Sequence, residues 1–264
     1  MLRIVGYPDR YSVAPGEKIA FKISLEEGDH FDARLIEVVN GDCNPAGPGL
    51  QFRHVPTPID GRHPGKKQRI DAGSYMIAER MPALGAFTFF AFVWPTLPKW
   101  GEAVIAAQWD PAAKAGFSIG MVEGGCPSLT VGDGSGAIRT VCVPHPMLER
   151  QWYRLAVTVD PESRAVTLEQ RPLVPYAMVE DHGVFRGSLD IVPAAVEAPF
   201  YLAGRPEEDG TVGVHFDGKI DGPTLLSGVH VIADHDALIT GLASRELQAD
   251  VVARWDFSRG IETI

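Results

Sequence analysis

AFTFFAFVWP, residues 86–95, is an apolar run that is rich in phenylalanine and ends at a proline. Similar short runs, rich in Val, Ile, Phe and Thr, lie before and after it between frequent glycines and prolines, which is typical of β-strands joined by turns. Because no long helical pattern separates them, the sequence predicts an all-β antiparallel sandwich or jelly roll. The clearest predicted strands are residues 18–25, 33–39, 73–79, 86–95, 103–109, 116–122, 128–132, 152–160, 165–170, 198–204 and 213–226.

One segment near the C-terminal end departs from the strand pattern. DHDALITGLASRELQADV, residues 234–251, has three leucines near helical spacing and two aspartates at its start, where carboxylates favour the helix dipole. The segment predicts a short helix near residues 234–248 that is broken near Gly241.

The first part of the chain is less regular. Two predicted strands, residues 18–25 and 33–39, are preceded by a Pro-Gly turn, a pattern common where an immunoglobulin-like sandwich begins. The passage that follows, residues 40–69, is dominated by Pro, Gly and charged residues, which is typical of a linker, a lid or a crossing between domains. Two strands cannot bury a core, so we expect an incomplete immunoglobulin-like strand pair and seam loop in residues 1–50, and a sandwich in residues 51–264.

Composition excludes several classes of partner. The 264 residues carry a formal net charge of −10, and no basic run is interleaved with aromatic residues, so nucleic acid is not an expected partner. No apolar stretch is long enough for a signal peptide or a membrane span, which predicts a cytoplasmic protein without a membrane partner. The three cysteines have no paired short spacing and are expected to be free thiols.

The acidic, histidine and glycine-rich motifs of the sequence favour structural interpretations over catalytic or metal-binding ones. No Glu-x-Asp-x-Glu pattern of a sugar hydrolase is present, and the acidic cluster at residues 207–209 is typical of a solvated hairpin tip. The eight histidines are scattered singly. Asp133 and Ser135, in VGDGSGA, favour a turn between strands over a calcium loop or a nucleophile elbow. The sequence therefore predicts no catalytic residue and no metal ligand in this chain.

Four residues are candidate ligand-binding positions. Asp42 and Asn44 lie in VNGDCNPAGPG, residues 39–49, where Asx side chains either satisfy loop amides, the favoured interpretation, or bind a ligand. Trp94 and Trp100 flank a Pro-rich bend, and such tryptophans cap a core, stack on sugars or anchor a partner protein. A carbohydrate-binding, lectin-like module is therefore an alternative function.

The order of several motifs resembles known families. FTFFAFVWP, VIAAQWD, GFSIGM, WYRLAVTVDPESRAVTL, FDGKIDGPTLLSG and ARWDFS resemble a laminin-G-like, concanavalin A-like jelly roll, a superfamily that includes lectins and glucanases. Over nearly the whole chain, GYPDRYSVAPGEKIAF, NGDCNPAGPG, QRIDAGSYM, VGDGSGA, FDGKIDGP and ARWDFSRGI resemble the N-terminal part of the large subunit of N,N-dimethylformamidase and its relatives.

The second resemblance implies a role within a larger enzyme. The family enzyme is an iron-dependent amide hydrolase that releases dimethylamine and formate, with its iron ligands in a downstream domain. The resemblance thus implies that this chain is a structural and interaction module without iron or catalytic residues of its own. Its implied partners are the downstream catalytic domain or other subunits, and a homo-oligomer is compatible with it. The loop at residues 40–49 would then mark where the chain leaves one sandwich and enters an inserted one.

Overall fold

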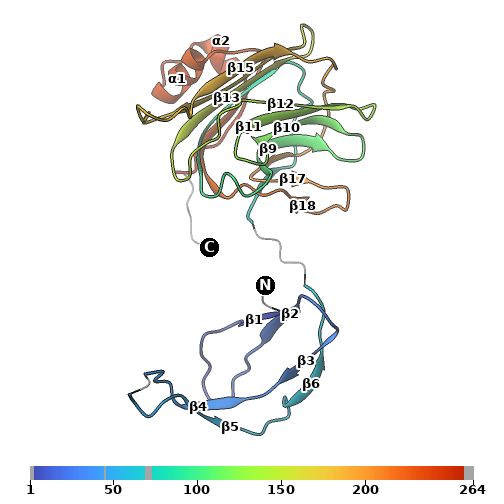
Figure 1. Ribbon diagram of the computed structural model, residues 1–264. Coiled ribbons are helices and arrows are strands. Elements are labelled where there is room, and N and C mark those ends of the chain that lie inside the picture. The colour runs from blue at the N-terminus through green and yellow to red at the C-terminus, as the bar shows by residue number, and fades with distance from the viewer. Residues whose placement is uncertain (1–2, 45, 69–72, 259–264) are drawn as a thin grey trace. The chain divides into compact units, whose positions relative to one another are not determined.

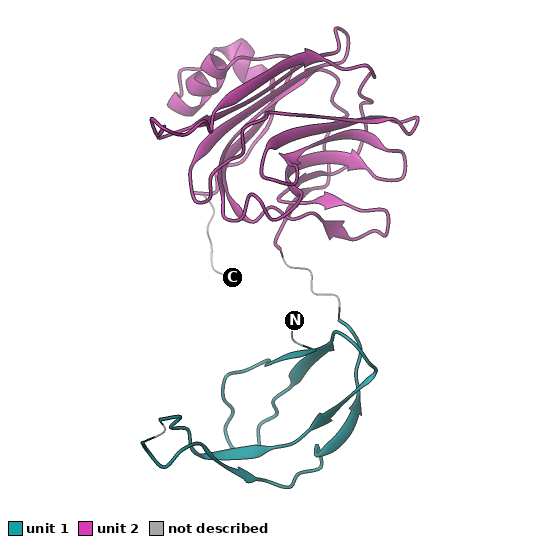
Figure 2. Cartoon of the chain, in the orientation of Figure 1, with its two compact units in different colours: residues 1–71 teal, residues 72–264 magenta. Residues whose placement is uncertain are grey.

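In the computed structural model, which describes residues 3–44, 46–68 and 73–258, the chain forms two compact units: unit 1, residues 1–71, and unit 2, residues 72–264 (Figure 2). The sequence predicts a division at residue 50, and this position falls inside unit 1. Strands that follow residue 50 pair with strands that precede it.

Unit 2 is built from two six-stranded sheets in which neighbouring strands are antiparallel (Figure 1). The first sheet has the order β12 (Ile138–Cys142), β11 (Pro127–Asp133), β10 (Ala115–Met121), β9 (Ala103–Asp110), β16 (Phe200–Leu202) and β7 (Met76–Ala78). The second has the order β15 (Gly183–Ser188), β14 (Ala165–Pro172), β13 (Tyr153–Asp160), β8 (Phe87–Pro95), β19 (Gly218–Ser227) and β20 (Val251–Arg254). A small hairpin, β17 (Arg205–Pro206) and β18 (Val212–Gly213), accompanies them. The predicted all-β antiparallel sandwich is confirmed.

Strand β8 explains why the sequence around residue 90 is so apolar. Side chains alternate between the faces of a strand, so Phe89 lies in the core between the two sheets while Phe90 points to the opposite face of its sheet. Two helices, α1 (Ile232–Thr240) and α2 (Arg245–Ala249), cover that opposite face, and their Leu238 and Leu247 pack in one cluster with Phe90 (Figure 1). A central strand that is covered on both faces is apolar at nearly every position.

The two helices lie over the segment in which the sequence predicts a helix. Helix α1 ends at Gly241, whose φ of 75° is the left-handed conformation that glycine adopts readily. Helix α2 begins after Ser244, whose side chain accepts a hydrogen bond from the amide of Leu247. No helix among the described residues is both long enough and apolar enough to cross a membrane.

Helix α1 carries a buried histidine. His235 is only 2% exposed and stacks on the Phe90 ring, with 4.6 Å between ring centroids. Burial, and then the positive charge of Arg154, lower its pKa to about 4; Arg254 acts in the same direction and Asp236 against it. In the unfolded chain the pKa of this histidine is about 6.5, so the unfolded chain takes up a proton more readily than the folded one. The free energy of unfolding is therefore unaffected by protonation of His235 above pH 6.5 and falls as the pH is lowered towards 4.

We therefore expect acid to destabilise unit 2 through His235. Between pH 7.5 and pH 4.5, the free energy of unfolding should fall by about 2 kcal/mol more in the native protein than in a His235→Phe variant, which keeps a stacked ring but cannot be protonated. Urea denaturation at both pH values measures the difference, and the variant controls for all other titrating groups. Parallel losses in the two proteins would contradict this role for His235.

Unit 1 consists of three two-stranded antiparallel sheets. The pairs are β1 (Ile4–Pro8) with β2 (Phe21–Leu25), β3 (His30–Ala33) with β6 (Gly61–Pro64), and β4 (Ile36–Asn40) with β5 (Gln51–His54). The passage predicted to be irregular thus contains β5 and β6, whose sequences QFRH and GRHP are too polar to show a strand pattern. The loop at residues 41–50 joins β4 to β5, so it is a hairpin loop within unit 1 and does not connect the two units.

The described part of unit 1 has almost no interior. Leu25, at 3% exposure, is its only buried residue. Large apolar side chains on several of its strands and loops are instead exposed to solvent. They are Ile4, Val5, Tyr7, Tyr11, Phe21, Leu35, Ile36, Val38, Val39, Leu50, Phe52 and Ile59. A small β unit needs a buried apolar face to be stable by itself, and the described part of unit 1 has paired strands without such a face.

Candidate binding surface

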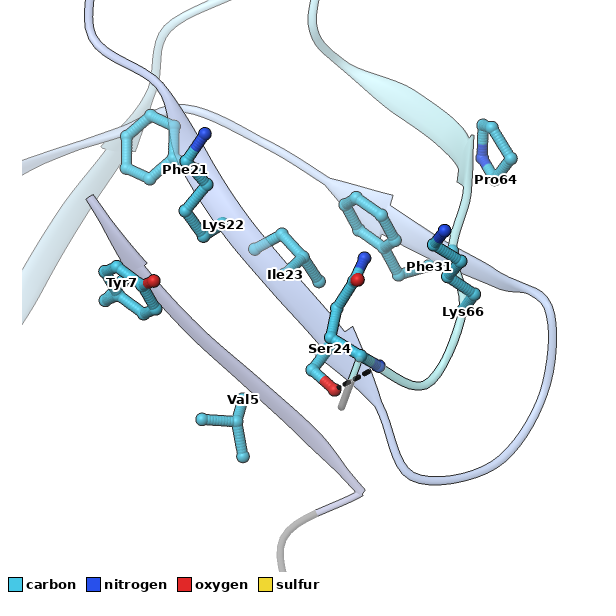
Figure 3. A pocket seen from close by; sticks show the side chains of 11 residues that line it. Val5, Tyr7, Phe21, Lys22, Ile23, Ser24, Phe31, Pro64 and Lys66 are labelled. Atoms are coloured by element: carbon cyan, nitrogen blue, oxygen red, sulfur yellow. Dashed lines mark hydrogen bonds between the residues drawn. The ribbon is translucent and has the colours of Figure 1, made fainter. Parts of the chain in front are cut away.

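An open groove of about 700 Å³ lies in unit 1 (Figure 3). Its walls come from β1, β2, β3, the end of β6 and the segment that follows β6. We refer to this surface as the unit 1 groove. It is lined by Val5, Tyr7, Phe21, Lys22, Ile23, Ser24, Phe31, Pro64, Gly65, Lys66 and Gln68.

One edge of β2 at this groove is unpaired. The hydrogen bonds from Asp9 N to Ala20 O and from Glu26 N to Arg3 O extend the β1–β2 ladder, so even-numbered residues of β2 direct their backbone groups towards β1. Phe21, Ile23 and Leu25 therefore direct theirs to the other edge. The Leu25 amide is bonded there to Lys66 O at 3.1 Å, and within the described chain β2 pairs with β1 alone. Among the described residues, the backbone groups of Phe21 and Ile23 have no strand partner on this edge.

The charged groups that line the groove are both positive. Lys22 and Lys66 belong to its lining, and no carboxylate does. Within the described residues neither lysine forms an ion pair, in contrast to Lys67, whose ammonium group lies 2.6 Å from a carboxylate oxygen of Glu26. The groove therefore combines apolar side chains, open backbone groups and unneutralised positive charge.

The predicted candidates Asp42 and Asn44 form a chain of Asx turns. The Asn40 side chain accepts from the Asp42 amide at 3.2 Å, Asp42 accepts from the Asn44 amide at 2.8 Å, and Asn44 accepts from the Ala46 amide at 3.0 Å. A Cβ added at Gly47 would lie 2.5 Å from an Asp42 carboxylate oxygen, so glycine is favoured at this position. These contacts support the structural interpretation of Asp42 and Asn44, and ligand binding by them stays a prediction.

The two candidate tryptophans lie in different environments. Trp94 is partly buried on β8, with the Lys219 ammonium 4.5 Å from its ring centroid. Trp100 is 85% exposed in the loop after that strand. Trp100 is thus free to stack on a ligand, whereas Trp94 is already covered on one face.

The acidic and turn motifs have structural partners. Asp133 accepts hydrogen bonds from the amides of Ser135 and Ala137, in the turn that joins β11 to β12. The residues 207–209 lie at the tip of the β17–β18 hairpin. Both arrangements agree with the interpretations favoured by the sequence.

Among the described residues, no group of three or more His, Cys, Asp or Glu side chains is arranged to hold a metal ion. The described donors therefore do not fit an iron centre.

The groove was not predicted from the sequence, although part of the pattern was visible. The alternation in residues 18–25 places Phe21, Ile23 and Leu25 on one face of a strand. Phe31 and Lys66 reach the groove from segments with no strand pattern, so only the fold brings them together.

The fold and this surface define a mainly β protein in which an antiparallel sandwich follows a small β unit with an open groove. In sequence, the chain is similar to the N,N-dimethylformamidase beta subunit of Alcaligenes sp, with 32% identity over 278 aligned positions that cover 98% of the chain. The beta subunit of Paracoccus aminophilus is 30% identical over the same share. The chain spans 36% of the length of each relative. No family model matches it.

The chain also resembles solved structures in part. A putative carbohydrate binding protein from Bacteroides ovatus has a TM-score of 0.49 and 12% identity, over 99% of this chain and 62% of that one. Domains LG4-5 of the mouse laminin alpha1 chain have a TM-score of 0.42 and 11% identity, over 59% of this chain and 40% of that one. With TM-scores this low, no function is carried over from these proteins to this chain. The fold is described from the strand order of the two sheets.

Proposed function

We propose that this chain is a non-catalytic structural and interaction module of a dimethylformamidase-related amide hydrolase. The observation that carries the proposal is the similarity of 98% of the chain to two N,N-dimethylformamidase beta subunits. In this proposal the complete enzyme hydrolyses N-substituted formamides in the cytoplasm, with an iron centre outside the present residues. The module contacts the catalytic domain or other subunits, and the exposed apolar surface of unit 1 supports such a contact.

The proposal predicts that activity depends on a larger assembly. The isolated chain, supplied with iron(II), should release no formate from N,N-dimethylformamide above a protein-free control. A chimera in which this chain replaces the aligned part of the Paracoccus aminophilus beta subunit should assemble with its partner subunits and hydrolyse the amide. Size-exclusion chromatography and formate assays measure the two properties, with the unmodified enzyme as the positive control.

Two results would contradict the proposal. Repeated turnover by the isolated chain would show that it is catalytic. A chimera whose sandwich folds but which neither assembles nor hydrolyses the amide would show that the module does not serve this enzyme.

Carbohydrate binding is a second candidate, favoured by the exposure of Trp100. Aromatic side chains at such positions present an apolar ring face on which a sugar ring can stack. On a glycan array, reproducible micromolar binding to one sugar class that is lost in Trp100→Ala would favour this candidate over the first.

A further inference from the structure

We infer that the unit 1 groove is the docking site for a single extended β-strand of a partner polypeptide, with apolar side chains at alternate positions and acidic residues at its ends. This inference rests on the proposed role in a larger assembly and names the chemistry of the partner segment. Three properties of the groove support it: the open backbone edge, the apolar lining and the uncompensated lysines.

The open edge favours an extended strand. Within the described part of the chain, Phe21 and Ile23 have no strand partner for the backbone N–H and C=O on the groove side of β2. A strand laid along this edge would pair with them. The hydrogen bond between the Leu25 amide and Lys66 O already occupies the end of the edge. The space therefore suits a strand of a few residues and not a long ribbon.

The lining predicts which side chains the strand carries. Val5 and Tyr7 of β1 lie on the face of the β1–β2 ladder that also carries Lys22. Phe21 and Ile23 form an apolar surface on the other face, with Phe31 of β3 nearby (Figure 3). Strand side chains alternate between two faces, so every second residue of the docked strand would meet this apolar surface. The docked strand would supply the covering that unit 1 lacks, because Leu25 is the only buried side chain in its described part.

The charges argue for an acidic partner and against a second copy of this chain. Lys22 and Lys66 are unpaired in the described structure, so glutamates at the ends of a docked strand would find ion-pair partners. Two copies pairing through the same β2 edge would instead bring the lysines of both grooves together, and like charges oppose that pairing.

A designed peptide tests the inference on the isolated chain. The probe is a fluorescein-labelled heptapeptide with the sequence EVTVTVE and capped ends, and the measurement is fluorescence anisotropy. We expect saturable binding with a dissociation constant of roughly 10–500 μM. The peptide KVTVTVK should bind at least about tenfold more weakly because its charges repel the lysines. A central proline, as in EVTPTVE, should weaken binding because it removes a backbone donor.

Charge reversal identifies the groove as the binding site. Lys66→Glu should make the chain bind KVTVTVK at least as well as EVTVTVE, whereas the matched control Lys99→Glu, at an exposed lysine of unit 2, should keep the original preference. Circular dichroism checks that both variants remain folded.

Three outcomes would overturn the inference. The first is the absence of binding at 1 mM peptide, and the second is an unchanged charge preference in Lys66→Glu. The third is concentration-dependent dimerisation of the chain that Ile23→Asp abolishes, because a second copy of the chain would then occupy the groove. Failure here together with a chimera that assembles would remove the docking inference and leave the proposed function standing. Binding of the peptide together with a chimera that does not assemble would remove the proposed function and leave the docking inference standing.

Discussion

Replacement of Tyr153 by phenylalanine is expected to lower the free energy of unfolding of unit 2 by about 3 kcal/mol. The Tyr153 hydroxyl is buried, accepts a hydrogen bond from the Leu148 amide at 2.8 Å and donates one to an Asp181 carboxylate oxygen at 2.8 Å. Burial raises the pKa of Tyr153 well above its ordinary value, so the hydroxyl stays a donor at every pH of interest. Without it, an amide loses its acceptor and a carboxylate that is 1% exposed loses its donor.

A matched variant separates this loss from the general effect of removing a hydroxyl. Tyr201 is also buried, and no hydrogen bond of its hydroxyl is found in the described structure, so Tyr201→Phe should change the unfolding free energy by less than about 0.5 kcal/mol. Urea denaturation followed by tryptophan fluorescence measures both variants. Equal midpoints for Tyr153→Phe and the native protein would show that the buried pair contributes nothing.

The Tyr153 contact also holds the end of a loop, residues 173–182, that carries exposed apolar residues. The Gln170 side chain donates to Asp181 O at 2.6 Å, so β13, β14 and the end of the loop at residues 173–182 are joined in one buried network. Tyr153→Phe should therefore loosen this loop as well as the sheet.

The sandwich was predictable because its central strands are apolar on both faces. Residues 86–95 and 103–109 are buried almost throughout, and such runs between glycines and prolines favour strands. The edge strands β12 and β15 were not predicted, since sequences such as IRTVC and GVFRGS have mostly exposed side chains and no clear alternation. Exposed edge strands are held by backbone pairing, which a hydrophobic pattern does not record.

Unit 1 was harder to predict for the same physical reason. Its strands β5 and β6 are polar and pair with partners on the other side of long loops, so neither periodicity nor turn motifs locate them. The sequence did indicate that two strands near the N-terminal end lack a core. It could not show that Phe31 and Lys66 would join β2 around one groove, because that depends on pairings between distant segments.

We propose that unit 1 is an open β unit that a partner strand completes. Stability differs between regions of a protein, and amides exchange with solvent according to the free energy of local opening. In the described part of unit 1 the backbone amides of Phe21 and Ile23 have no strand partner, whereas those of Phe89 and Ala91 lie in the centre of a six-stranded sheet with a buried core.

Hydrogen–deuterium exchange of the isolated chain, resolved by mass spectrometry of peptic peptides, tests this claim most directly. The account predicts that peptides covering β2 exchange within seconds, while peptides covering β8 exchange at least about 10⁴-fold more slowly, as an opening free energy above roughly 5 kcal/mol requires. Addition of the EVTVTVE peptide should slow exchange in β2 and leave β8 unchanged. Uniformly slow exchange across both units of a monomeric chain would contradict the account, because unit 1 would then be complete without a partner.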